Sequence, residues 1–115
     1  MRRDNERLKD IHEAILKIEK YTVRGKNIFF EDELIQTWVL FHLHTIGESA
    51  SAMSKDFKAR FPVVPWQDMS DFRNLIVHEY FRINFKVVWQ IVENDLPILK
   101  QQVDFILDHV KNDEN

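Results

Sequence analysis

Arg73, Asn74 and His78 are the residues of this chain whose types and spacing could do chemistry together. An ideal helix turns by about 100° per residue, so the three side chains share an arc of roughly 140°. The opposite arc holds the core-seeking residues of the same segment, which are Met69, Phe72, Leu75 and Ile76. The spacing therefore predicts that Arg73, Asn74 and His78 face away from the core of their own domain.

An arginine and a histidine on one face suit the cleavage of RNA through its own 2′-hydroxyl. That reaction needs a base for the hydroxyl, an acid for the leaving oxygen, and positive charge beside the phosphorane-like transition state. Histidine titrates near neutrality and suits the first two tasks, and the arginine fork suits the third. Because one His78 cannot be acid and base in the same step, two copies of the motif would have to share a cleft. The scheme needs no metal, and we expect no cofactor.

The residues around His78 indicate what surrounds this face. Val77 and Phe81 place apolar side chains beside the polar ones, which suggests a covered surface. The simplest cover is a second copy across a two-fold axis, so a homodimer is expected. If the helix continues past His78, Glu79 falls on the apolar side and pairs with a buried donor. Tyr80 then lies about 20° from Arg73 and roughly 10 Å further along the axis.

The scarcity of glycine and proline and the helical periodicity of apolar residues predict the elements that must position this motif. The chain has two glycines and three prolines, so long helices are expected. Pro62 and Pro65 make the segment 62–66 a rigid loop, because each proline disfavours helix at the residue before it. Pro97 should split the last helix, with Asp95 as the N-cap of its second half. The predicted fold is an all-α, up-and-down bundle of four to five helices. The helices are expected over residues 4–23, over 32–54 with a short continuation to 61, from 67 onward, and over 84–111.

Local signals refine three of these elements. Gly25 can take a left-handed conformation and end the first helix. The acidic run 31–33 suits the positive N-terminal end of the second helix. Small residues over 46–52 should let another backbone approach that helix closely. His42 and His44 are two apart and diverge on a helix, which argues against a metal site.

Composition limits the class of protein. The 115 residues fit a single domain, 1–115, and 44% hydrophobic residues can build a core without disulfides or a structural metal. The chain has no cysteine, which fits a reducing compartment. No apolar run approaches the roughly 20 residues of a membrane span, and the charged N-terminus does not look like a signal peptide. We expect a cytoplasmic protein without membrane association.

Charge leaves two function classes open. The net charge is -3, which is unusual for a protein that relies on tight binding of phosphate backbones. Residues 55–86, however, carry 6 Lys and Arg against 4 Asp and Glu, so the segment with the motif is locally basic. One class is an RNA-cleaving enzyme, which the Arg73 and His78 pair favours. The alternative is a non-catalytic helical binding module, which the acidic charge favours and which the family resemblance described next pairs with a nucleotidyltransferase or a nucleotide.

Several motifs resemble one known family. They are the stretch 46–50, the loop 64–66, the run 72–81, and Val88-Trp89 followed by Asp95-Leu96-Pro97. In this order they resemble the HepT-like family of the HEPN superfamily, over essentially the whole chain. The resemblance implies a dimeric helical bundle that acts as a metal-independent endoribonuclease toxin of a toxin–antitoxin pair. It also implies an antitoxin that is a minimal nucleotidyltransferase, which silences the toxin by adenylylating a motif tyrosine.

The resemblance also implies roles for individual residues. By position, Arg73 and His78 match the catalytic pair, Asn74 matches its polar neighbour, and Tyr80 matches the modified residue. Glu48 could support the site by orienting Arg73 from across the cleft, or it could be a carboxylate bonded within its own helix. The chain departs from the family pattern at Asp71, where glycine is frequent. It departs again over 82–84, and both changes bear on activity level and substrate preference.

Overall fold

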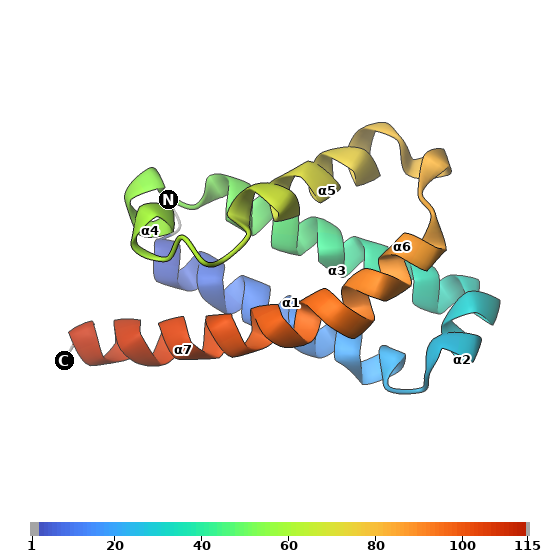
Figure 1. Ribbon diagram of the computed structural model, residues 1–115, viewed down its shortest axis with the longest axis horizontal. Coiled ribbons are helices and arrows are strands. Elements are labelled where there is room, and N and C mark those ends of the chain that lie inside the picture. Colours follow the sequence, from blue (N-terminus) through green and yellow to red (C-terminus); the bar gives the residue numbers. More distant parts are fainter. Residues whose placement is uncertain (1–2, 115) are drawn as a thin grey trace.

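Four long helices run alternately in opposite directions along the molecule (Figure 1). The computed structural model describes residues 3–114, and the side chains of residues 3–110. In that part of the chain all regular structure is helical, as predicted. The elements are α1 (Asp4–Thr22), α2 (Lys26–Glu31), α3 (Glu33–Ala52), α4 (Lys55–Arg60), α5 (Trp66–His78), the 3-10 turn η1 (Tyr80–Arg82), α6 (Phe85–Gln90), the π-helical turn η2 (Ile91–Asp95) and α7 (Leu96–Glu114).

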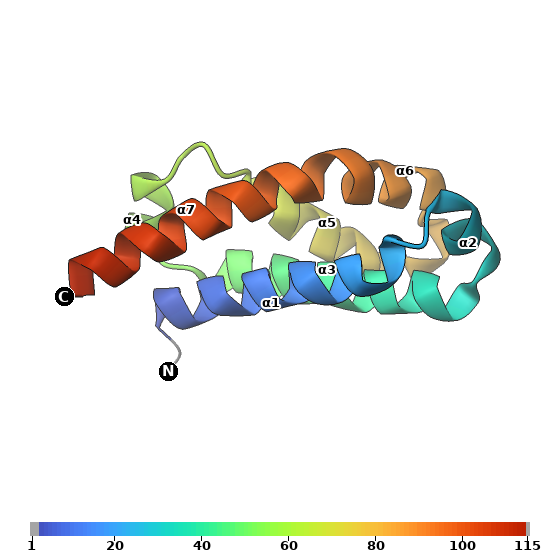
Figure 2. The ribbon, with the colours of Figure 1, turned by 90° about the horizontal axis from the view of Figure 1, so that it is seen from below.

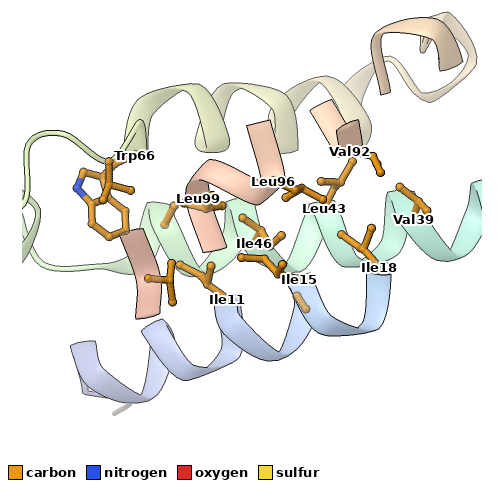
Figure 3. Close-up of a cluster of buried hydrophobic side chains, with 14 of the residues drawn as sticks. Ile11, Ile15, Ile18, Val39, Leu43, Ile46, Trp66, Val92, Leu96 and Leu99 are labelled. Atoms are coloured by element: carbon orange, nitrogen blue, oxygen red, sulfur yellow. The ribbon is translucent and has the colours of Figure 1, made fainter. Parts of the chain in front are cut away.

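The central helix is α3, which packs against α1 on one side and α5 on the other. Asp32 caps its N-terminus, because the carboxylate accepts the backbone N–H groups of Leu34 at 2.9 Å and Ile35 at 3.2 Å. Figure 2 shows α1 and α3 side by side, with α7 running above them and packed on α1. Figure 3 shows the shared core, whose buried side chains include Ile11, Ile15, Ile18, Leu43, Ile46, Leu96 and Leu99.

The turn between α1 and α3 holds a short helix that the sequence did not predict. Gly25 has a φ of 100° and a ψ of 167°, so its positive φ is confirmed, but it precedes α2 rather than closing α1 in a left-handed helical turn. Phe29 explains why α2 forms. Its side chain is 1% exposed and its ring lies 5.3 Å from that of Trp89, so packing against α6 holds this turn in helical form.

The helix that carries the motif ends at His78, earlier than expected. Glu79 leaves helical geometry with φ −137° and ψ 40°, and Tyr80 begins the 3-10 turn η1. The angles predicted for Glu79 and Tyr80 are therefore wrong. The chain must reverse here so that α6, capped by Asn84, can bury Val88 completely. This tertiary requirement outweighs the helical periodicity of the sequence.

The expected split at Pro97 is also wrong. Leu96 has helical φ and ψ values of −62° and −40°, and its N–H bonds the carbonyl of Ile91, five residues back. Asp95 therefore lies inside a helix and does not cap a new one. The wide turn η2 provides room where the proline ring would clash with a normal α-helical carbonyl. As a result α6, η2 and α7 follow one another without a break.

No helix in the described chain is long and apolar enough to cross a membrane. The described part also holds no cluster of three or more His, Asp or Glu side chains with the geometry of a metal site. A mainly apolar groove of about 500 Å³ lies between α3, α5 and α7. Arg73 and His78 do not line this groove. The candidate chemistry therefore lies elsewhere, on the side of α5 that meets α3.

Candidate active site at the seam of two helices

A single glycine brings α3 and α5 into close contact. A Cβ atom placed on Gly47 would lie 2.2 Å from the Cβ of Arg73 and 2.7 Å from the carbonyl oxygen of Met69. Only a residue without a side chain fits such an approach. One turn along the seam, the hydroxyl groups of Ser51 and Ser70 are hydrogen-bonded at 2.8 Å. The predicted role of the small residues in α3 is therefore confirmed.

This contact places Arg73 on Glu48. The carboxylate oxygen Oε1 of Glu48 accepts a hydrogen bond from Nε of the guanidinium group and forms an ion pair with Nη2. Nη1 donates to Oδ1 of Asn74 at 3.0 Å. A guanidinium group carries five N–H donors, so at least two remain beyond the contacts with Glu48 and Asn74. These remaining, outer donors belong to a fork whose orientation Glu48 and Asn74 fix.

The prediction that Arg73 faces away from its own domain needs a correction. Its side chain is 30% exposed, and its stem lies over Gly47 on the neighbouring helix. The angle of Arg73 on α5 follows from helical spacing, but the position of α3, which approaches closely because of Gly47, does not. Glu48 and Arg73 lie together within one chain, whereas the sequence left open whether Glu48 bonded only within its own helix.

His44 of α3, which was not among the predicted site residues, also belongs to this cluster. Nε2 of His44 lies 3.7 Å from Oε1 of Glu48, the same oxygen that holds Arg73. The spacing of four residues between His44 and Glu48 puts both on one face of α3. That spacing indicates the contact between His44 and Glu48. It does not place His44 near the motif, because that position depends on the packing of α5 on α3.

His78 lies at the end of the same seam. It is the last residue of α5 and is exposed, and no side chain within residues 3–110 hydrogen-bonds its ring. Since α3 and α5 are antiparallel, one turn back from Gly47 and one turn on from Arg73 reach the same level. His44 on α3 and Val77 on α5 therefore lie between Arg73 and the end of the seam, where His78 follows.

The residues after His78 are exposed. The side chain of Tyr80 is 46% exposed, and its ring meets the ring of Phe81 edge-on at 5.7 Å. Glu79 forms an ion pair with Arg82 at 3.6 Å, so the prediction of a buried partner for Glu79 is wrong. The reason is again the early end of α5, which turns Glu79 toward solvent.

An apolar patch adjoins the polar cluster. Phe41 of α3 is 62% exposed, Val77 is 46% exposed, and Phe81 is 99% exposed. Large apolar side chains gathered at one end of a polar face are typical of surfaces that a partner covers. The predicted homodimer would cover this patch, and it stays a prediction.

The other histidine of α3 belongs to the core and not to the site. His42 is 5% exposed, and within the described chain its Nε2 is buried without a hydrogen-bond partner. Burial lowers the pKa of His42, and the positive charge of Lys17 on α1 lowers that pKa further. Glu13 acts in the opposite direction. His42 therefore stays neutral near pH 7 and faces α1, on the other flank of α3 from Arg73.

Comparison with known proteins gives the same family that the motifs resemble. The family described as HepT-like, ribonuclease HepT-like, matches residues 11–106 of this chain. A Thermococcus cleftensis protein named probable ribonuclease HepT is 39% identical over 97 residues, covering 81% of this chain and 86% of its own. A candidate RNase of Methanocaldococcus jannaschii is 36% identical over 80 residues, covering 70% of this chain and 73% of its own. No solved structure matches.

Proposed function

This chain belongs to the HepT-like ribonuclease family, and on that premise we propose that it is a metal-independent endoribonuclease with Arg73 and His78 as its catalytic pair. The observation that carries the proposal is the fixed guanidinium group of Arg73. Glu48 contacts its Nε and Nη2 atoms and Asn74 its Nη1 atom, and the remaining N–H donors stay available to a phosphate. A bidentate fork of this kind matches the geometry of a phosphodiester.

The proposed reaction uses only the RNA and the two side-chain types. His78 accepts the proton of the 2′-hydroxyl, and the 2′-oxygen attacks the adjacent phosphorus. The bond to the 5′-oxygen breaks, and the histidine of a second copy donates a proton to this leaving group. Arg73 stabilises the negative charge that develops on the phosphoryl oxygens. The products are a 2′,3′-cyclic phosphate and a free 5′-hydroxyl.

A homodimer would supply the second histidine. Its interface would lie over Val77 and Phe81, with Arg73 and His78 of both copies beside one cleft. The exposed apolar patch at this end of the seam supports the arrangement, because such side chains would otherwise remain in water. The two-fold symmetry of a homodimer would bring the same patch together from both copies.

We further propose that the chain is the toxin of a toxin–antitoxin pair. Its partner would be a minimal nucleotidyltransferase that attaches adenylyl groups to Tyr80. The exposure of the Tyr80 side chain supports access by a modifying enzyme. An adenylyl group two residues beyond His78 would add bulk and a negative phosphate at the cleft, and like charge would repel incoming RNA.

A cleavage assay tests the enzymatic proposal. The purified chain should cut total RNA with or without EDTA, and Arg73→Ala and His78→Ala should each abolish cleavage while keeping the helical circular dichroism spectrum. His12→Ala is a matched control, because His12 pairs with Asp104 at 2.9 Å on a different part of the surface. Cleavage that EDTA stops would rule out the metal-independent mechanism. No cleavage by a folded wild-type chain would favour the alternative of a docking module, which the net charge of -3 supports.

A further inference from the structure

Glu48 holds two basic side chains on one oxygen atom. Oε1 accepts a hydrogen bond from Nε of Arg73, forms an ion pair with Nη2, and lies 3.7 Å from Nε2 of His44. With a neutral imidazole, the guanidinium and carboxylate charges cancel within this cluster. With a protonated imidazole, the cluster carries one net positive charge beside the outer donors of Arg73.

We propose that His44 is a positioning residue that sets the charge of the phosphate-binding site through Glu48. The proposal rests on the role of Arg73 proposed above. A protonated His44 shares Oε1 with Arg73, so Glu48 neutralises less of the guanidinium charge while it still orients the group. Because a histidine side chain gains a positive charge when it takes up a proton, RNA binding becomes stronger at lower pH.

The surroundings of His44 keep this effect specific to the cluster. Glu48 faces it from its own helix, and Arg73 faces it from α5. The charged residues of α1 that act on α3, Glu13 and Lys17, act on His42, which faces the other flank. The side chains of His44 and Glu48 are 34% and 48% exposed, so solvent screens their interaction and the expected effect on binding is about threefold to fivefold.

Binding to RNA that cannot be cleaved separates this proposal from catalysis. The protein is the His78→Ala chain, which removes the other histidine of the site. The probe is a fluorescein-labelled pool of 2′-O-methyl oligoribonucleotides, and the readout is its dissociation constant at about pH 5.5 and about pH 8. We expect binding to be about threefold to fivefold tighter at the lower pH. Circular dichroism at both values checks that the chain stays folded.

Variants at position 44 give the decisive comparison. His44→Gln should bind with the weaker constant at both pH values, since glutamine cannot take up a proton. His44→Lys should bind with the tighter constant at both, since lysine keeps its charge. His12→Gln is the matched control and should keep the pH dependence of the parent. A His44→Gln chain whose binding still follows pH as in the parent would overturn the proposal.

Arg73→Ala, introduced into the His78→Ala chain, distinguishes the proposed phosphate role of Arg73 from the proposed role of His44. Loss of binding at both pH values supports the phosphate role of Arg73. If Arg73→Ala binds as tightly as the parent, that role fails, and the proposal for His44 falls with it. If Arg73→Ala weakens binding but His44→Gln leaves the pH dependence intact, only the proposal for His44 is wrong.

Discussion

At the scale of single residues, the site depends on Glu48, whose carboxylate oxygen Oε1 contacts both Arg73 and His44. Glu48 adds little to stability, because ion pairs that are partly exposed contribute about 0–1 kcal/mol. Its effect on the site is to orient the guanidinium group of Arg73. A guanidinium group fixed along one edge presents its outer donors without having to lose side-chain freedom when a phosphate binds.

Tyr80 gives a prediction at this scale. Its hydroxyl lies outside the Arg73, Asn74 and Glu48 network, so Tyr80→Phe should keep RNA cleavage and toxicity. Co-expression with a cognate nucleotidyltransferase should add multiples of an adenylyl mass to the wild-type chain and silence it. Intact-mass spectrometry should show no such addition on Tyr80→Phe, which should stay toxic. A Tyr80→Phe chain that is still modified and neutralised would show that the switch lies elsewhere.

At the scale of helices, the close approach of α3 and α5 builds the site. Gly47→Ala should push the helices apart, because the new Cβ would lie 2.2 Å from the Cβ of Arg73. We expect a loss of about 1–3 kcal/mol in the free energy of unfolding, together with reduced cleavage. Urea denaturation measures the first and the RNA assay the second. Ser51→Ala, one turn away on the exposed side, is the control and should change stability by less than about 1 kcal/mol. Equal stability of the two variants would contradict the packing argument.

The elements that the sequence predicted well are those with local causes. The extent of α1, the acidic N-terminal end of α3 and the small residues around Gly47 follow from neighbours along the chain. The elements that it missed have distant causes. Burial of Phe29 holds α2 in helical form, and burial of Val88 ends α5 at His78. The contact of His44 with Glu48 could be predicted from spacing, but its relation to Arg73 required the packing of α5 on α3.

At the scale of the whole molecule, the exposed apolar patch predicts self-association. Phe81→Glu should place a charge in the proposed interface and yield a monomer, measured by light scattering after size-exclusion chromatography. Phe105→Glu is the matched control, because Phe105 is 67% exposed on α7 and should leave the dimer intact. A wild-type chain that is already monomeric at micromolar concentration would contradict the predicted homodimer.

The stability of the whole molecule should also depend on the pH through His42. Burial and the charge of Lys17 lower the pKa of His42 in the folded chain below its usual value of 6.5. As the pH falls, the unfolded chain therefore binds the proton more readily than the folded chain does. The free energy of unfolding should therefore fall as the pH falls from about 7.5 to about 5.5, by at most about 1.4 kcal/mol per pH unit. His42→Leu should remove this part of the slope in urea titrations. An identical slope in wild type and variant would show that other groups cause it.

The chemical form of the cleaved RNA tests the central claim most directly. Wild-type protein is incubated with a defined oligoribonucleotide in EDTA, and the masses of the fragments are measured. The account predicts a 5′ fragment that ends in a 2′,3′-cyclic phosphate and a 3′ fragment that begins with a 5′-hydroxyl, and no fragments from His78→Ala. Fragments that carry a 5′-phosphate, or an identical pattern from His78→Ala, would contradict cleavage through the 2′-hydroxyl by Arg73 and His78.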